Sequence, residues 1–218
     1  MKAFASLRTS LIALLSTVAT APAIAQGINY SELEQLFGEP VTTSATGKPQ
    51  RVTEVPANMD IITQTDVKRS GAKDIPTILQ RLAGLSVESS GARSYDVAVR
   101  GYNQPGAPRL LVLINGRQVY LDHYGLVAWS TLPVQLAEIQ QIEVVRGPNS
   151  ALFGFNAAAG VINIVTTNPL TDSVNSASVS FGNDGQKNGS LVGTTRVGDR
   201  IGLRLSLGGD YAEQYKGV

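Results

Sequence analysis

The sequence predicts an α+β fold, with one compact domain over residues 50–170 followed by a run of antiparallel strands. Three observations predict this fold. Two β-branched runs, at 142–146 and 161–165, have the composition of strands and enclose a stretch of small residues. Residues 75–82 place apolar side chains on one side of a helix. Beyond residue 169, apolar and polar residues alternate, which indicates strands with two unlike faces.

Residues 1–25 have the pattern of an export signal and are left out of the fold. Lys2 and Arg8 make the start basic, a short apolar core follows, and Ala-Ile-Ala stands before Gln26. The apolar core is shorter than the roughly 20 residues that a membrane-spanning helix needs. We therefore expect the mature chain to begin at Gln26; the alternative is a retained amphipathic anchor.

The composition argues against several classes of site. The chain has 18 basic and 17 acidic residues, and loss of Lys2 and Arg8 with the signal leaves 16 and 17, so a nucleic-acid partner is not expected. It has no cysteine, and its one histidine, His123, cannot form a multi-histidine metal site. No paired carboxylates, phosphate loop or nucleophile elbow is visible in the sequence. We expect no enzyme, no metal centre and no cofactor.

Residues 26–49 are weakly patterned. Leu33, Leu36 and Phe37 follow one another at helical spacing, which allows one or two helical turns before Gly38. Residues 39–45 are extended and β-prone. A short extended segment without a strand mate can add itself to the sheet edge of another protein. We expect this stretch to be mobile when no partner is bound, because it has few large apolar residues.

The compact domain alternates short strands with short helices. Asp74 caps the clearest helix and Gly84 ends it. Asn115 and Gly116 form a hairpin turn signal between two further strands. The remaining expected elements are strands at 59–63, 85–88, 97–100, 110–114 and 117–120, a short helix between residue 65 and Gly71, and another at 133–136.

Residues 171–218 alternate in polarity along three predicted strands, with turn signals at 183–185 and 198–200. One apolar and one polar face is typical of transmembrane strands with lipid on one side and water on the other. A soluble hairpin packed on a core has the same pattern, so both alternatives remain open at this point. Three strands cannot close a barrel, which needs at least about eight. We expect the chain to be a fragment of a longer product or the product of a truncated gene.

The run IEVVRGPNSALFG at 142–154, followed by GVINIVT at 160–166, resembles the C-terminal signature of the plug domain in TonB-dependent outer-membrane receptors. The resemblance implies a small mixed-sheet plug domain with short helices at 50–170. It also implies that 171–218 are the first antiparallel strands of an incomplete transmembrane β-barrel. Residues 155–159 differ from the glycine-richer sequence that is commoner in the family. This difference bears on which subfamily and which substrate the resemblance implies. Further landmarks similar to those of the family stand in family order at 61–63, 70–72, 84–87, 99–101 and 111–116.

The resemblance implies the N-terminal part of a receptor for energised uptake of a scarce nutrient, such as a ferric siderophore, vitamin B12 or a similar ligand, with the plug gating the pore. The location would be the outer membrane of a Gram-negative cell, with the plug facing the periplasm. A TonB-type energy-coupling protein would contact residues 26–49 at a segment that resembles the TonB box: Glu39, Pro40, Val41, Thr42, Thr43, Ser44 and Ala45. The alternative is a soluble periplasmic binding or interaction domain with a plug-like fold.

Two loops are expected to face a small-molecule or metal-chelate substrate, from their place in the family pattern. The second of them carries aromatic groups and an imidazole suited to touch a chelate or an organic ring. The alternative is that these loops only close the pore. The candidate residues are Tyr102, Asn103, Gln104 and Pro105 in the first loop, and Tyr120, His123, Tyr124 and Trp129 in the second.

Arg100 and Arg146 each end an apolar strand and precede a glycine. In a small soluble domain such arginines would be solvated surface residues. The resemblance implies instead that both point the same way off the plug, face the barrel wall and pair with barrel glutamates. On that expectation, losing either side chain costs little in this chain alone and more in an assembled receptor.

Overall fold

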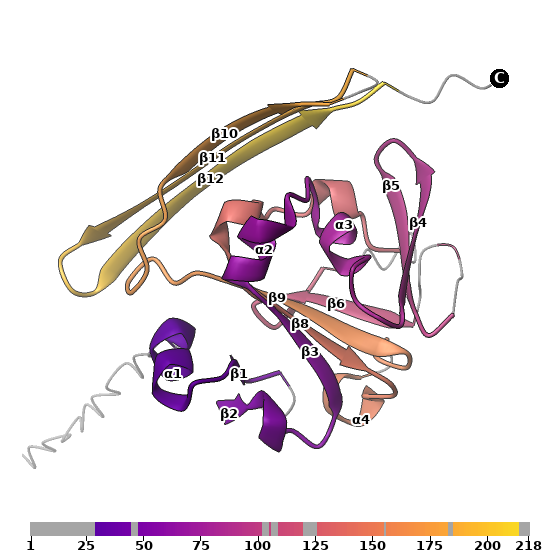
Figure 1. Cartoon of the computed structure of the whole chain (residues 1–218). Helices are drawn as coiled ribbons and strands as arrows, with labels where there is room; N and C mark the ends of the chain where they lie inside the picture. Colours follow the sequence, from indigo (N-terminus) through magenta and orange to yellow (C-terminus); the bar gives the residue numbers. More distant parts are fainter. Residues whose placement is uncertain are drawn as a thin grey trace, which may run out of the picture.

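The computed structural model describes residues 29–44, 48–101, 105, 109–119, 126–154, 156–182 and 185–213. Its centre is a five-stranded sheet with the order β3-β8-β9-β6-β7. Figure 1 shows helices α2 (Gln64–Ser70) and α3 (Ile75–Leu79) between this sheet and a curved three-stranded outer sheet, and the N-terminal elements on the opposite face. The central strands are β3 (Asn58–Thr63), β6 (Leu110–Ile114), β7 (Arg117–Gln118), β8 (Ile139–Arg146) and β9 (Gly160–Thr166).

The central sheet is mixed, as predicted. Strand β8 runs antiparallel to both β3 and β9, whereas β6 runs parallel to β9. The two β-branched runs of the sequence thus form the neighbouring central strands β8 and β9. The expected turn at Asn115 and Gly116 joins β6 to β7. The expected helix over 75–82 is shorter, because its last residues form turns, although Leu82 still packs on the core.

The elements around the sheet are short. Thr63 and Asp66 form a capping box at the start of α2, and the Asp74 side chain accepts a hydrogen bond from the Thr77 N–H at the start of α3 (2.8 Å). The other elements are α1 (Tyr30–Phe37), β1 (Val41–Thr42), β2 (Gln50–Arg51), η1 (Val52–Glu54), α2 (Gln64–Ser70), α3 (Ile75–Leu79), β4 (Leu85–Gly91), β5 (Ser94–Val99), η2 (Trp129–Thr131), η3 (Leu136–Glu138) and α4 (Ser150–Phe153).

A bulge at Gln140 decides which side chains of β8 face which layer. The register with β9 shifts between Ile139 and Gln141, so one extra residue interrupts the alternation. Ile139, Ile142 and Val144 therefore all pack in the main core beneath the helices. Gln141 and Glu143 fall on the opposite face by alternation from Ile142.

The two faces of the central sheet are unlike. The helix-covered face carries the buried apolar side chains of the main core. On the other face, one half is a small apolar cluster that includes Leu111, Val145 and Val161, with Phe153 of α4 packed against it. The other half carries the buried polar side chains of Gln141, Glu143 and Asn163. The N-terminal elements lie over this polar half.

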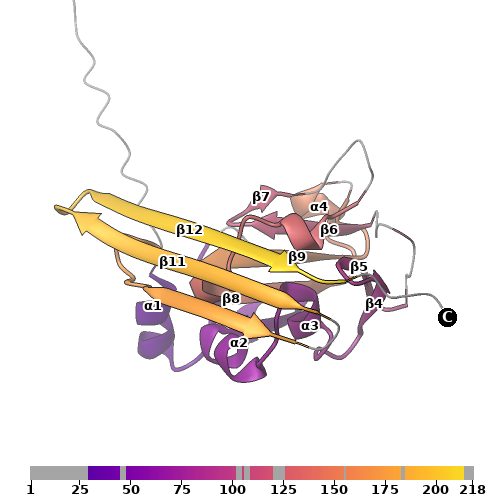
Figure 2. The same ribbon diagram turned by 90° about the horizontal axis from the view of Figure 1, so that it is seen from above.

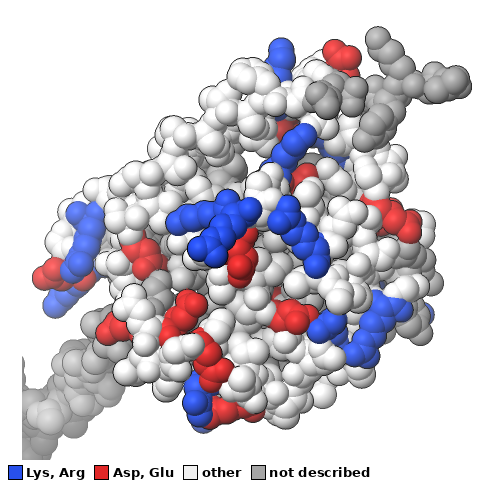
Figure 3. Space-filling model, in the orientation of Figure 1, with Lys and Arg blue, Asp and Glu red and all other residues white. Residues whose placement is uncertain are grey.

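The outer sheet consists of β10 (Ser176–Phe181), β11 (Lys187–Val197) and β12 (Ile201–Tyr211), paired antiparallel as predicted. Figure 2 shows this sheet lying across the compact domain of residues 50–170, which we call the plug after the resemblance. Leu203, Leu205 and Leu207 are exposed, whereas Arg204 and Ser206 between them bind the plug and Val192 of β11 is buried. In Figure 3 the charged side chains lie over the plug and at the two ends of the outer sheet, and the stretch between them is uncharged. Among the described residues, no helix is long and apolar enough to cross a membrane.

Candidate functional site

The segment expected to bind a coupling protein has a strand mate inside the chain. We call residues 39–44 the strap. Val41 pairs antiparallel with Arg51, and Thr42 with Gln50, and both strap residues are 1% exposed. The Val52 N–H also donates to the Pro40 carbonyl (3.2 Å). The expectation that this segment lacks a strand mate is therefore wrong. Its partner is only two polar residues long, so no alternation in the sequence could reveal it; Ala45 lies outside the described residues.

The strap lies on the polar half of the central sheet. The Gln141 Nε2 donates to the Val41 carbonyl (2.8 Å), so the strap backbone is bonded on the side away from β2 as well. The Ser44 hydroxyl donates to the Glu143 carboxylate and accepts from Asn163 Nδ2 (2.8 Å). A further strand cannot add to Val41 in this arrangement unless these bonds open first.

Glu143 is fully buried at 0% exposure. Besides Ser44, it accepts hydrogen bonds from Gln141 Nε2 (2.7 Å) and Asn163 Nδ2 (3.2 Å). All three donors are neutral, and among the described residues Glu143 makes no ion pair. A buried charge held by neutral donors alone keeps much of its desolvation cost.

Side chains at the two ends of the strap add weaker contacts. The Tyr30 hydroxyl lies 2.7 Å from the Thr43 hydroxyl, and burial raises the pKa of the Tyr30 phenol, which therefore stays neutral. Glu39 accepts a hydrogen bond from Thr53 (2.9 Å) and lies 3.4 Å from the Arg51 guanidinium. These last groups are exposed or half-exposed, so each contributes little to stability.

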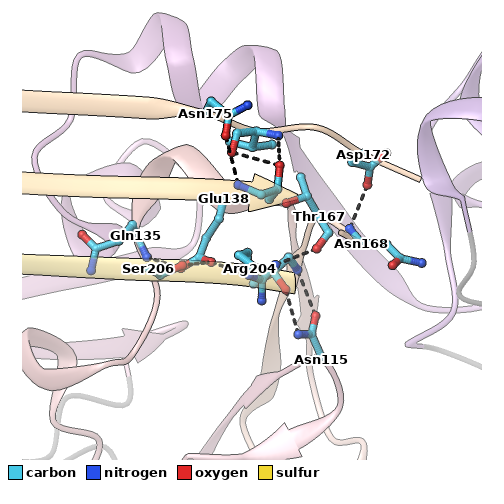
Figure 4. A network of polar contacts seen from close by, with 12 residues as sticks. Asn115, Gln135, Glu138, Thr167, Asn168, Asp172, Asn175, Arg204 and Ser206 are labelled. Atoms are coloured by element: carbon cyan, nitrogen blue, oxygen red, sulfur yellow. Dashed lines mark hydrogen bonds and ion pairs between the residues drawn. The ribbon is translucent and has the colours of Figure 1, made fainter. Parts of the chain in front are cut away.

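A second buried glutamate, Glu138, binds the outer sheet (Figure 4). Its Oε2 lies 2.9 Å from Arg204 Nε and accepts from the Ser206 hydroxyl at 2.7 Å, while the Gln135 N–H donates to Oε1 at 2.7 Å. Arg204 also donates to the Thr167 carbonyl (2.6 Å). The Glu138 side chain is 2% exposed. This network joins the plug to β12 by a buried ion pair with every carboxylate oxygen bonded.

Two glycines of β12 let its backbone lie directly on the plug. A Cβ at Gly202 would stand 2.7 Å from the backbone carbon of Pro169, which is closer than van der Waals contact allows. At Gly208 a Cβ would meet the end of the Gln135 side chain, which is flexible and could move aside. We call the contact of plug residues 135–138 and 167–170 with Gly202, Arg204, Ser206 and Gly208 the seat.

The sequence did not point to the seat. The resemblance placed arginines on the plug and glutamates on the barrel, whereas here the plug supplies Glu138 and the outer strand supplies Arg204. A weak signal was present: Arg204 and Ser206 stand at the polar positions of an alternating strand. What they bind, however, is decided by the approach of a segment far away in the sequence.

Arg146 and Arg100 are not placed alike, so that expectation is wrong. Arg146 is 18% exposed; it pairs with Asp60 (2.6 Å) and donates to the Ala83 carbonyl (2.7 Å), all within the plug. Arg100 is exposed and has a positive φ of 53°. The difference arises because Arg146 ends a central strand beside β3, whereas Arg100 lies in the turn after the peripheral strand β5. Contacts of either arginine with barrel glutamates stay a prediction.

Of the predicted substrate-facing residues, Trp129 is placed differently from the expectation. It is 8% exposed and belongs to the main core. An indole is mostly apolar, and here burial against the core outweighed exposure in a loop. Pro105 is exposed. The other candidates lie outside the described residues: Tyr102, Asn103, Gln104, Tyr120, His123 and Tyr124.

Comparisons with known proteins agree with this architecture. Residues 51–161 match the family model "TonB-dependent Receptor Plug Domain". The chain is 30% identical over 189 residues to the vitamin B12 transporter BtuB of Vibrio vulnificus, covering 85% of this chain and 30% of that protein. It is 35% identical over 147 residues to BtuB of Photobacterium profundum, covering 66% of this chain and 23% of that protein. The chain thus spans less than a third of the length of these relatives.

Solved structures share the fold. The alcaligin outer-membrane receptor FauA of Bordetella pertussis has a TM-score of 0.62 at 20% identity, covering 79% of this chain and 29% of that one. The pyoverdine-bound FpvA of P. aeruginosa has a TM-score of 0.61 at 17% identity, covering 74% of this chain and 21% of that one. Because the family model matches more than half of this chain, the chain belongs to the family of TonB-dependent receptors and carries their plug domain.

Proposed function

We propose that this chain is the plug-bearing part of an outer-membrane receptor that takes up a scarce nutrient, with the plug closing the pore. The observation that carries the proposal is the seat, where the polar face of the outer sheet binds the plug through Glu138 and Arg204. The opposite face exposes large apolar side chains: Val179, Phe181, Leu191, Leu203, Leu205 and Leu207. An apolar band of this size is unfavourable in water and suits lipid. A soluble periplasmic domain is therefore not favoured.

The substrate class follows from the relatives. Two of them are named vitamin B12 transporters, and similar solved structures are those of receptors for alcaligin and pyoverdine. We propose a substrate of this kind, a corrinoid or a ferric siderophore, bound on the outward loops. The expected export signal at 1–25 and an outer-membrane location with the plug facing the periplasm belong to the same proposal.

We further propose that the strap is the segment captured by a TonB-type coupling protein through strand addition. Its backbone is extended and pairs with β2, which supports a role in pairing of this type. Because both sides of Val41 are bonded in the structure, the strap must leave the sheet before a partner strand can bind.

Fractionation and uptake test the proposal. Cells that express the protein from its own gene are separated into osmotic-shock fluid and outer membrane, and uptake of radiolabelled cyanocobalamin and of ferric siderophores is compared with that of cells lacking the gene. We expect the protein in the outer membrane and loss of uptake of one substrate class. Recovery of the protein in the shock fluid would overturn the proposal.

Val41→Pro tests the coupling role of the strap. Proline lacks the N–H that a strand ladder uses, so strand addition should fail, and energised uptake should fall to the background of cells lacking the coupling protein. Substrate binding to the purified receptor should be unchanged, because Val41 lies in the N-terminal strap and not in the loops expected to face the substrate. Val41→Ile keeps the N–H and the β-branch and is the matched control, with uptake retained. Normal uptake by the proline variant would exclude the strap as the captured segment.

A further inference from the structure

Two Asn-Gly pairs stand in the sequence, Asn115–Gly116 and Asn188–Gly189, and they occupy different local structures. The first pair forms the two-residue turn between β6 and β7, with φ of 50° at Asn115 and 77° at Gly116. A turn of this length favours asparagine and glycine because both tolerate positive φ. The second pair lies within β11, in the ladder with β12. One chain thus holds the same dipeptide in a turn and in a strand.

An Asn-Gly pair is the place in a chain where asparagine loses ammonia most readily. The backbone nitrogen of the glycine gives up its proton to a base in solution and attacks the side-chain carbonyl carbon of the asparagine. A new C–N bond forms, and the side-chain nitrogen leaves as ammonia after taking up a proton. Water then opens the resulting succinimide ring to aspartate or isoaspartate. Glycine has no Cβ to hinder the attack, and asparagine counts among the thermolabile residues.

Strand β9 binds both reacting groups of the turn. Asn115 Nδ2 donates to the Thr166 hydroxyl (2.8 Å), and Asn115 Oδ1 accepts from the Thr166 N–H (2.9 Å; Figure 4). The Gly116 N–H, whose nitrogen would attack, donates to Asn163 Oδ1 (3.1 Å). The side chain and the nitrogen are therefore each engaged with a different residue of β9, although Asn115 itself is exposed.

The acceptor for the Gly116 N–H is fixed by the buried polar half of the sheet. Asn163 is 5% exposed, and its Nδ2 donates to the Ser44 hydroxyl (2.8 Å) and to Glu143 (3.2 Å). A side-chain amide has one donor end and one acceptor end. With its donor end bound in the sheet, Asn163 presents its oxygen to Gly116.

We propose that Asn115 is a modification site that β9 keeps unreactive. It is converted to aspartate or isoaspartate only from conformations in which the turn has left Thr166 and Asn163. The rate then follows the fraction of molecules in which this turn is open. Isoaspartate adds one carbon to the backbone, so conversion would also disturb the register that the two-residue turn sets between β6 and β7. This property of the turn is independent of the nutrient that the receptor takes up.

Mass spectrometry after incubation in heavy-oxygen water tests the proposal. The detergent-extracted protein is kept at mildly alkaline pH in water labelled with heavy oxygen and is then digested with trypsin in ordinary water. Trypsin cleaves after lysine and arginine, so residues 110–117 and residues 188–196 are released as separate peptides. Each peptide contains one asparagine and no glutamine. Heavy oxygen in either peptide therefore reports conversion of one known residue during the incubation.

In the folded protein, Asn115 should be converted about 100-fold more slowly than in the same protein unfolded in guanidinium chloride, because three hydrogen bonds must open first. Thr166→Val removes the hydroxyl and keeps the β-branch. It should speed conversion of Asn115 about 3- to 10-fold, with conversion of Asn188 unchanged. Thr166→Ser keeps the hydroxyl and is the matched control, with no change expected at either asparagine.

Asn163→Ala removes the acceptor of the Gly116 N–H and should act in the same direction as Thr166→Val. Equal rates at Asn115 in the folded and the unfolded protein would overturn the proposal. An equal acceleration at Asn115 and Asn188 in Thr166→Val would overturn it as well, because it would come from general destabilisation and not from loss of a bond at the turn.

Discussion

Glu138 and Glu143 lie close together along one stretch of chain and are both buried, yet they serve different contacts. Glu138 faces a cation on the outer sheet, with its other oxygen held by a backbone N–H. Glu143 faces hydroxyl and amide donors, one of which belongs to the strap. Two carboxyl groups that are buried alike are thus held by different kinds of partner, one by a cation and the other by neutral donors alone.

Replacing each glutamate by glutamine tests this comparison most directly. Glu138→Gln should lower the free energy of unfolding by about 2–4 kcal/mol, because Arg204 loses its counter-charge while largely buried. Glu143→Gln should cost about 1 kcal/mol or less, because the neutral amide loses charge-assisted bonds but also loses the desolvation cost of the carboxylate. Chemical unfolding of both variants measures the difference. Equal losses of unfolding free energy in the two variants would show that the charge of the partner does not distinguish the two buried glutamates.

The two arginines extend the comparison within the plug. Arg146→Ala should destabilise the plug by about 1–3 kcal/mol, because Asp60 and the Ala83 carbonyl lose a charged donor. Arg100→Ala is the matched control and should cost at most about 0.5 kcal/mol, as for other exposed side chains. Thermal unfolding distinguishes them. A cost for Arg100→Ala as large as that for Arg146→Ala would show that the turn after β5 has a partner beyond the described residues.

The smallest effect is expected at the surface pair beside the strap. Arg51 donates a hydrogen bond to Glu54 and holds the pKa of that carboxyl below its usual value. A lowered pKa stabilises the fold above the ordinary glutamate pKa of about 4.3, and this contribution disappears as the pH falls through the lowered value. The stability gap between the unaltered protein and Glu54→Gln should therefore close on acidification. A stability gap that widens at low pH would contradict a lowered pKa for Glu54. Both groups are exposed, so the gap itself is small.

Much of the fold could be predicted because it rests on local pattern. The runs that became β8 and β9 carry β-branched residues in short blocks, and Asp74 and the pair Asn115 and Gly116 mark a helix start and a turn by their own chemistry. The alternation in β11 and β12 predicted one polar and one apolar face. Each of these signals is complete within about ten residues of chain.

The partners of the functional side chains could not be predicted in the same way. The strap pairs with a two-residue strand that has no apolar pattern, and Ser44 meets Glu143 across 99 positions. Trp129 stands in a stretch that looked like an outward loop and is part of the core. The pairing of Arg146 with Asp60 within the plug was not predicted. In every case the contact depends on which distant segment approaches.

The sequence by itself determined the family, most of the longer strands and helices, and the two faces of the outer sheet, because periodicity and turn chemistry are properties of neighbouring residues. Only the tertiary structure decided that the strap is already paired and that a plug glutamate holds an outer-strand arginine. Ser206 and Glu138 are 68 positions apart, and Gly202 and Gly208 matter only because a plug segment lies against them. Such contacts depend on packing across the whole domain, which no short stretch of sequence encodes.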